Sequence, residues 1–287
     1  MILTRTAAEL AALPRGRRRA VVMTMGALHE GHLSLIRRAR ELGDQVVVTI
    51  FVNPLQFDEQ ADYDRYPRTL EADLALLEPF GVDAVFAPSE AEMYPAGEPT
   101  ATVSAGVIGR VLEGAARPGH FDGVVTVVAK LLHLTAPDVA VFGAKDAQQV
   151  IAVNALVRDL NFPVEIATAA TVRDDDGLAR SSRNVFLSPE ERHTSLGLSR
   201  ALFAARDAAE AGQPLPAVIA AGRAILDGDD GIGLDYFAAL NPADASELEG
   251  DYRGEVVIAV AARVGATRLI DNVTTRIGSP SAEGDWR

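Results

Sequence analysis

The chain of 287 residues is long for a single hydrophobic core and sufficient for two domains. Hydrophobic residues make up 48% of it and charged residues 23%, which is typical of a globular protein and excludes general disorder. The formal net charge of −13 argues against nucleic acid or an anionic membrane surface as the main partner. The absence of cysteine excludes disulfide bonds and thiolate metal sites.

No apolar run approaches the roughly 20 residues that span a bilayer, and the N-terminus lacks the pattern of a secretory signal peptide. We therefore expect a cytoplasmic protein that acts on small molecules, with no nucleic-acid or membrane partner. An anionic substrate needs local cations in so acidic a chain. The arginine-rich segment at residues 15–19 is interpreted as a solvated lead-in to the first strand rather than as a nucleic-acid patch.

The first candidate site runs from Met25 to His32. It follows a β-branched run at residues 20–24, which predicts a buried parallel strand, and it precedes apolar residues at helical spacing. Gly26 and Gly31 allow the backbone to turn tightly and to approach a ligand closely. A helix N-terminus adds unpaired N–H groups and partial positive charge. This turn therefore predicts an anion site.

His29 and His32 stand at the mouth of this turn, where imidazole groups can donate to phosphate oxygens. A surface turn or a metal-binding pair is the alternative. However, the spacing is not the His-Glu-x-x-His of zinc peptidases, and no cysteine can complete a thiolate site. The segment also differs from the glycine motifs of dinucleotide folds and phosphate loops. A nucleotide site is therefore favoured.

A second apolar strand is predicted at residues 45–52, and Asn53-Pro54 ends it. Gln56 follows, at the kind of strand C-terminus where α/β folds place ligand contacts. Its amide has donors and an acceptor, so it can hold a hydroxyl and a carboxylate together. An ordinary exposed glutamine is the alternative.

The next part of the chain has fewer chemical signals. Its predicted elements are a helix at residues 67–80 with Leu70, Leu74 and Leu77 directed inward, a strand at 83–87, and a helix from 124 to 134. His120 lies in the turn before the last of these helices. A histidine in this position is more often structural than functional when no other signal accompanies it.

Residues 139–160 repeat the strand, turn and helix of the first candidate site. A buried strand at 139–142 leads into Gly143-Ala144-Lys145-Asp146 and then a helix at 147–160. Lys145 at such an exit can reach nucleotide phosphates, although a solvated surface lysine is the alternative. Gln149 lies in the first turn of the helix and is expected to point toward the same predicted site as Lys145.

A strand at 164–169 ends the alternating pattern, and the polar turn at 173–177 is taken as the domain boundary. Just beyond it, Ser181-Ser182-Arg183-Asn184 offers two hydroxyls and a guanidinium, which suit a phosphate clamp. A capping turn before the next helix is the alternative, and the two roles are compatible. The remaining predicted elements are helices at 189–211 and 216–226, strands at 234–240, 255–264 and 267–274, and a disordered last dozen residues.

The alternating pattern predicts an α/β fold. Residues 1–171 are expected to form a doubly wound, Rossmann-like parallel sheet that binds the nucleotide and substrate at its strand C-termini. Residues 172–287 are expected to form a smaller α+β domain that closes over the site.

His29-Glu30-Gly31-His32 resembles the His-x-Gly-His signature of the nucleotidyltransferase superfamily that includes class I aminoacyl-tRNA synthetases. Four segments narrow the resemblance to pantothenate synthetases, because they occur in that family's order and approximate spacing over nearly the whole chain: Met25 to His32, Phe51 to Phe57, Gly143 to Gln149 and Ser181 to Asn184. The resemblance implies an AMP-forming ligase that condenses (R)-pantoate with β-alanine through an enzyme-bound pantoyl adenylate. It also implies ATP as a substrate, Mg²⁺ as the partner of ATP, and a homodimer.

The resemblance also supplies residue roles. His29, His32 and Lys145 are predicted to be catalytic, with His32 stabilising the transition state or supplying a proton. Pantoate is predicted to contact Gln56, Gln149, His120 and Met25. The predicted nucleotide contacts are Met25, Gly26, Ala27, Leu28, His29, Glu30, Gly31, His32, Gly143, Ala144, Lys145, Asp146, Val172, Arg180, Ser181, Ser182 and Arg183. No metal-ligand set is assigned, and Asp146 is only a weak candidate for Mg²⁺.

Three residues depart from the family pattern. Met23 replaces a usual proline, Ala144 replaces a usual glutamate, and Arg180 replaces an apolar residue, commonly methionine. We expect Arg180 to lie near the ATP phosphates. The alternatives are a sister nucleotidyltransferase that acts on a phosphorylated substrate, and a nucleotide-binding regulator that has lost catalysis.

Overall fold

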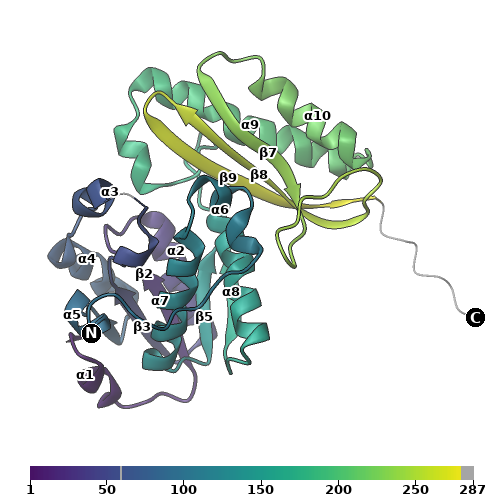
Figure 1. Cartoon of the computed structure of the whole chain (residues 1–287). Coiled ribbons are helices and arrows are strands. Elements are labelled where there is room, and N and C mark those ends of the chain that lie inside the picture. Colours follow the sequence, from purple (N-terminus) through teal and green to yellow (C-terminus); the bar gives the residue numbers. More distant parts are fainter. Residues whose placement is uncertain (59, 279–287) are drawn as a thin grey trace, which may run out of the picture. The chain divides into compact units, whose positions relative to one another are not determined.

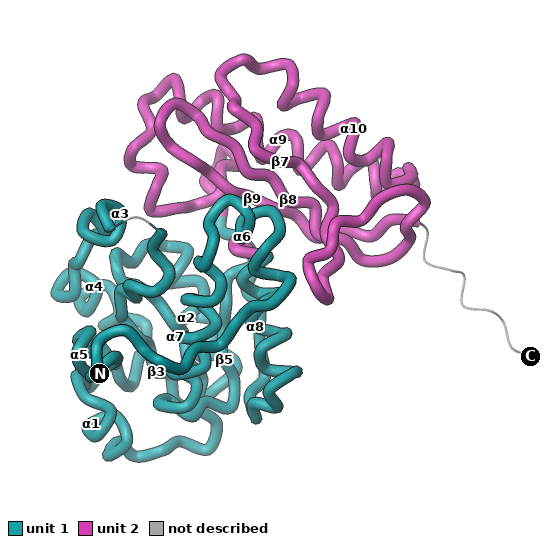
Figure 2. The backbone as a smooth tube through the Cα atoms, in the orientation of Figure 1, with its two compact units in different colours: residues 1–144, 148–172 teal, residues 145–147, 173–287 magenta. Residues whose placement is uncertain are grey.

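The computed structural model describes residues 1–58 and 60–278. These residues form two compact units, which Figure 2 colours separately. Unit 1 comprises residues 1–144 and 148–172, and unit 2 comprises residues 145–147 and the described residues from 173 onward. Within the described ranges, every helix is too short or too polar to cross a membrane. Most of the predicted C-terminal disorder falls outside the described residues, but Arg276 and Ile277 belong to the last strand, so the prediction is wrong for them.

Unit 1 contains a parallel sheet with the strand order β1-β4-β3-β2-β5-β6 (Figure 1). Its strands are β1 (Ile2–Thr4), β2 (Arg19–Thr24), β3 (Gln45–Ile50), β4 (Ala84–Phe86), β5 (Val139–Gly143) and β6 (Glu165–Ala169). From β2 the chain proceeds to β3 and β4 on one side, and it later returns to β5 on the other side. The order therefore reverses between β2 and β5, which is where open α/β sheets bind their ligands. This arrangement confirms the predicted α/β fold.

The helices of the N-terminal part vary widely in length. They are α1 (Ala7–Ala11), α2 (Glu30–Leu42), α3 (Gln60–Arg65), α4 (Leu70–Leu77), α5 (Glu90–Met93), α6 (Glu113–Ala116), α7 (His120–Thr135) and α8 (Ala147–Asp159). Leu33 and Ile36 of α2 pack in one cluster with Val22 of β2 and Val48 of β3. Val21 points to the opposite face and is also fully buried. The sheet is therefore covered on both faces, which explains its continuous apolar strands.

Arginines of the segment at residues 15–19 make contacts that hold the fold together. The interpretation of this segment as a solvated lead-in is wrong for Arg19. Arg19 is 5% exposed, and its side chain donates to the carbonyl of Thr135 at 2.7 Å and to Gln45 Oε1 at 2.8 Å. Burial lowers the pKa of the Arg19 guanidinium, and the nearby Arg15 adds to this effect. Arg15 itself pairs with Asp138 at 3.1 Å. These contacts tie the start of β2 to α7, β3 and the segment before β5.

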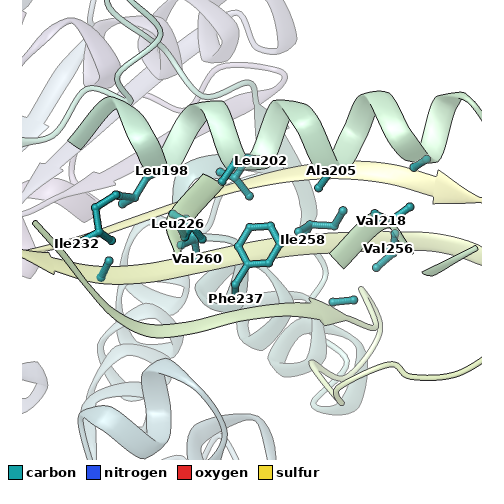
Figure 3. Packing of buried hydrophobic residues seen from close by; sticks show 14 of the residues in the cluster. Leu198, Leu202, Ala205, Val218, Leu226, Ile232, Phe237, Val256, Ile258 and Val260 are labelled. Carbon is teal, nitrogen blue, oxygen red and sulfur yellow. The ribbon is translucent and has the colours of Figure 1, made fainter. Parts of the chain in front are cut away.

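Unit 2 contains an antiparallel sheet with the order β7-β8-β9, and two long helices pack against it (Figure 1). The elements are α9 (Pro189–Glu210), α10 (Leu215–Leu226), β7 (Ile232–Leu240), β8 (Gly254–Val264) and β9 (Thr267–Ile277). Figure 3 shows Leu202 of α9, Phe237 of β7 and Ile258 of β8 in the shared core. A Cβ at Gly222 of α10 would overlap the Phe237 ring. Glycine therefore allows this helix to lie directly on the aromatic side chain.

Candidate active site

The turn after β2 adopts a left-handed backbone and is held by a buried carboxylate. Gly26 has φ +82° and Ala27 has φ +51°. Asp73 of α4 is 2% exposed, and it accepts hydrogen bonds from the N–H groups of Ala27 at 3.1 Å and Leu28 at 2.8 Å. Charged groups strengthen such bonds. The predicted flexibility of Gly26 is thus used in the turn, while Asp73 is a site residue that the sequence analysis missed.

The two histidines form a capping box at the start of α2. His29 is the N-cap, and its Nδ1 accepts from the N–H of Gly31 at 3.1 Å. The N–H of His29 in turn donates to Nδ1 of His32 at 3.2 Å. Their ring centroids lie 4.1 Å apart. Because a backbone N–H can only donate, both Nδ1 atoms are acceptors, so a neutral ring carries its proton on Nε2.

The prediction that Gly31 shapes the turn is wrong. Gly31 lies inside α2, and a Cβ there would come within 2.8 Å of the His29 imidazole. Its absence of a side chain makes room for the ring of His29. The prediction of unpaired N–H groups also needs correction, since the N–H groups of Gly31, His32 and Leu33 all donate to His29. The predicted anion site therefore offers the two imidazoles and the helix dipole more than free amides, and anion binding here stays a prediction.

Gln56 and His120, both predicted to contact substrate, lie together in unit 1. Gln56 ends the 3-10 turn η1 (Pro54–Gln56), and its carbonyl accepts from Nδ1 of His120 at 2.8 Å and from Arg117 at 3.2 Å. Arg117 also pairs with Asp58 at 3.3 Å. Burial raises the pKa of Asp58, but its own backbone N–H and Arg117 outweigh this and lower it.

The close packing of α7 against η1 supports the position of Gln56. A Cβ at Gly123 of α7 would collide with the carbonyl of Leu55. Glycine at this position therefore allows the helix to contact the backbone of the turn directly. Arg117 was not assigned a role from the sequence, although it stands only three residues before His120.

The two glutamines at the start of α8 have different environments. Gln148 is buried and donates to the carbonyls of Ile108 at 2.7 Å and Val111 at 2.8 Å, and it accepts from the N–H of Glu113 at 3.2 Å. It therefore anchors the loop before α6. Gln149 is half-buried and lies in the first turn of α8. Its predicted contact with pantoate stays a prediction.

Lys145 belongs to unit 2 by its contacts. Its carbonyl accepts a hydrogen bond of 2.7 Å from Nδ2 of Asn272 in β9. The Lys145 side chain is 18% exposed, and its Nζ lies 3.8 Å from Asp146. Over the ranges that the structure describes, no group of three or more histidines and carboxylates is arranged around a metal site. Asp146 is therefore a single, half-exposed carboxylate beside the lysine.

Arg180, which precedes the predicted phosphate clamp, lies in a network of charged side chains in unit 2. Arg180 lies 2.8 Å from Asp174, and Arg192 bridges Asp174 at 3.0 Å and Asp176 at 2.7 Å. The extra cation is thus balanced by a carboxylate. Its expected place near the ATP phosphates stays a prediction.

Ser181 caps the next turn, η5 (Ser182–Phe186), by accepting from the N–H of Arg183 at 3.3 Å. This contact matches the capping role that the sequence analysis left open for the serine motif. A capping serine keeps its hydroxyl hydrogen for another acceptor, so phosphate binding is compatible with this contact. The role of the motif as a phosphate clamp stays a prediction.

Comparisons with known proteins cover both units. A family model described as pantoate-beta-alanine ligase matches residues 3–274. Pantothenate synthetases from Streptomyces avermitilis and Thermobifida fusca are 50% and 56% identical to this chain. The first alignment covers 97% of this chain and 99% of the relative, and the second covers 95% of each.

Two solved structures are similar to this one. The pantothenate synthetase of Thermus thermophilus has a TM-score of 0.89 and 48% identity, over 95% of this chain and 99% of that one. The pantoate-beta-alanine ligase of Francisella tularensis, complexed with beta-gamma ATP and beta-alanine, has a TM-score of 0.77 and 33% identity, over 95% and 97% of the two chains. Because these similarities extend over nearly the whole sequence, the chain belongs to the pantoate-beta-alanine ligase family.

Proposed function

We propose that this protein condenses (R)-pantoate with β-alanine and uses ATP, giving pantothenate, AMP and pyrophosphate. The observation that carries this proposal is the histidine capping box after β2, at the point where the strand order reverses. It brings two imidazoles to the N-terminus of α2, where the helix dipole favours bound anions. The named relatives and the Francisella complex with beta-gamma ATP and beta-alanine support the choice of substrates.

The first chemical step joins two anions. A carboxylate oxygen of pantoate attacks the α-phosphorus of ATP, and the bond to the bridging oxygen breaks as pyrophosphate leaves with the electron pair. Negative charge builds on the phosphoryl oxygens, so donors aimed at them lower the barrier. We assign this role to Nε2 of His29 and His32 and to the ammonium group of Lys145.

A separate set of side chains positions pantoate in this proposal. The main-chain carbonyl of Gln56 accepts hydrogen bonds from His120 and Arg117, and its side-chain amide provides donors for pantoate oxygens. Gln149 supplies a second amide, and the half-buried Met25 offers apolar contact for the gem-dimethyl group.

In the second step the neutral amine of β-alanine attacks the carbonyl carbon of pantoyl adenylate. The C–N bond forms, the C–O bond to the phosphate breaks, and AMP leaves with that electron pair while the amine loses a proton. We assign the clamp on the departing AMP to Arg180, Ser181, Ser182 and Arg183, and the bound nucleotide to the turns at Met25–His32 and Gly143–Asp146 together with Val172.

Mg²⁺, a homodimeric state and a cytoplasmic location complete the proposal. Mg²⁺ prefers phosphate oxygens, water and one or two carboxylates, so Asp146 as a single carboxylate suits an ion that the triphosphate mainly holds. The ion would neutralise phosphate charge during the first step.

Isotope exchange tests this function. With ATP, Mg²⁺ and pantoate but no β-alanine, the enzyme is expected to exchange labelled pyrophosphate into ATP, because adenylate formation is reversible. Adding β-alanine is then expected to release AMP. A sister nucleotidyltransferase would exchange only with its own phosphorylated substrate, and a regulator would show no exchange. Exchange without pantoate, or AMP release that ignores β-alanine, contradicts the proposal.

A further inference from the structure

A buried chain of hydrogen bonds lies behind Gln56 in unit 1. The hydroxyl of Tyr94, at the end of α5, donates to Oδ1 of Asn53 at 2.8 Å. Nδ2 of Asn53 then donates to Oε1 of Gln56 at 3.1 Å. Tyr94 is 6% exposed and Asn53 is 1% exposed. These hydrogen bonds therefore connect the buried Tyr94 hydroxyl to the side chain of Gln56, which we propose to bind pantoate.

The orientation of each amide in this chain is determined by its partners. Nδ2 of Asn53 also donates to the carbonyl of Gly123 at 3.2 Å, and Oδ1 also accepts from the N–H of Leu55 at 3.4 Å. A carbonyl only accepts and a backbone N–H only donates, so the Asn53 amide cannot be reversed without losing both bonds. Oε1 of Gln56 is consequently the acceptor, and its Nε2 keeps two N–H donors for a ligand.

This orientation narrows what the sequence analysis expected of the Gln56 side chain. Gln56 was expected to hold a hydroxyl and a carboxylate with a donor and an acceptor together. Because Oε1 is directed toward Asn53, the NH₂ is the group left to face a ligand, and it suits carboxylate or hydroxyl oxygens.

Two neighbouring side chains contact the Tyr94 ring. The Lys130 ammonium lies 5.4 Å from its centroid, and the ring of Phe51 lies edge-on at 5.9 Å. Burial, with a smaller contribution from Glu90, raises the pKa of the Tyr94 hydroxyl. The phenol therefore stays protonated and remains a hydrogen-bond donor wherever the protein is folded at ordinary pH.

We propose that Tyr94 is a positioning residue for pantoate: its hydroxyl, with the N–H of Leu55 and the carbonyl of Gly123, holds the Asn53 amide in place, and this amide turns the NH₂ of Gln56 toward the substrate oxygens. The identity of the ligand rests on the proposed function, whereas the orientation of Gln56 rests on the hydrogen bonds alone. Tyr94 does not itself touch the substrate.

Tyr94→Phe removes only the hydroxyl and tests the proposal. A neutral hydrogen bond contributes on the order of 1 kcal/mol, so the KM for pantoate is expected to rise roughly three- to ten-fold. The KM values for ATP and β-alanine are expected to stay within about two-fold. Tyr252→Phe is the matched control. Tyr252 donates a 2.9 Å bond to the carbonyl of Glu255 in unit 2 and is not part of the hydrogen-bond network of Tyr94, Asn53 and Gln56.

A double-mutant cycle separates positioning from a purely structural effect. In a Gln56→Ala background, Tyr94→Phe is expected to leave the pantoate KM unchanged, since the group that it orients is gone. Thermal unfolding of each variant verifies that it folds. An equal rise in KM with and without Gln56 would overturn the proposal, and so would an unchanged KM in a folded Tyr94→Phe enzyme.

Gln56→Glu tests the donor claim independently. A glutamate can still accept from Asn53, but it presents an anion where the glutamine presents N–H groups. Use of pantoate is expected to fall at least 100-fold, more than for Gln56→Ala. If Gln56→Glu binds pantoate better than Gln56→Ala, the assigned orientation is wrong. If the wild-type enzyme does not use pantoate at all, the proposed function fails while the orientation of Gln56 stays open to structural measurement.

Discussion

The backbone N–H of His29 donates to Nδ1 of His32, so the residue assigned to the phosphates also caps the helix that presents it. The two roles use different ring atoms. Nδ1 accepts from the backbone, and Nε2 of the neutral ring carries the proton that the proposed chemistry uses. Loss of His32 therefore has a structural and a chemical component, and the two can be measured separately.

We predict that His32→Ala reduces turnover roughly 100-fold or more, because one donor to a developing charge contributes on the order of 3 kcal/mol. It also loses a cap, which costs about 1 kcal/mol of unfolding free energy. His32→Gln is the matched control, since glutamine at this position of a capping box restores the contact to the N–H of His29. We expect it to recover stability and not turnover. Recovery of both in steady-state kinetics and denaturant unfolding would show that the imidazole is not catalytic.

Gly31→Ala is predicted to displace the His29 ring, because the new Cβ would lie 2.8 Å from it. Turnover is expected to fall at least ten-fold as the imidazole leaves its capping position. Arg38→Ala, a change on the exposed side of the same helix where Arg38 pairs with Glu41, is expected to be neutral. Kinetics of both variants provide the test, and full activity of Gly31→Ala would mean that the position of the His29 ring is unimportant.

Asp73→Ala is predicted to destabilise the turn before α2. It leaves the N–H groups of Ala27 and Leu28 without their buried acceptor, which costs roughly 2 to 4 kcal/mol of unfolding free energy. Asp73→Asn keeps one acceptor oxygen and is expected to lose less. Chemical denaturation gives the values. Equal stability of the alanine variant and the wild type would contradict the role of Asp73.

Arg180→Met is predicted to weaken ATP binding, and more at low salt, where charge interactions are least screened. Asp174 keeps Arg192 as a partner, so the fold of unit 2 is expected to persist. The KM for ATP of the variant and the wild type is measured across a salt series, and thermal unfolding of both checks that the fold persists. An unchanged KM at every salt concentration would mean that Arg180 serves Asp174 alone.

The sequence predicts the long, strongly patterned elements well. The helix predicted at 189–211 is α9, whose start is marked by a capping box of Ser188 and Glu191. By contrast, β1 and α1 have three and five residues, too few for a recognisable period, and were missed. The helix predicted from residue 67 begins only at Leu70.

The candidate site shows the same limit. Short motifs single out His29, His32 and Lys145, but they do not say which nitrogen of each histidine ring bonds to the backbone. Asp73 did carry a signal, because it shares a helical face with Leu70 and Leu77 and is charged where an apolar residue is expected. Tyr94 carried none, since its partner Asn53 lies 41 positions away and only the folded chain brings them together.

The hydrogen bond from Asn272 to the carbonyl of Lys145 has a consequence for recombination between family members. A crossover placed at residue 172 would exchange β9, and with it the side chain that holds Lys145, while the lysine came from the other parent. The inherited block that keeps this pair together is discontinuous and consists of residues 145–147 with the segment from 173 onward. Chimeras that take this whole block from one parent are expected to keep Lys145 held by Asn272. A single crossover between the halves instead combines the loop of Lys145 from one parent with β9 from the other.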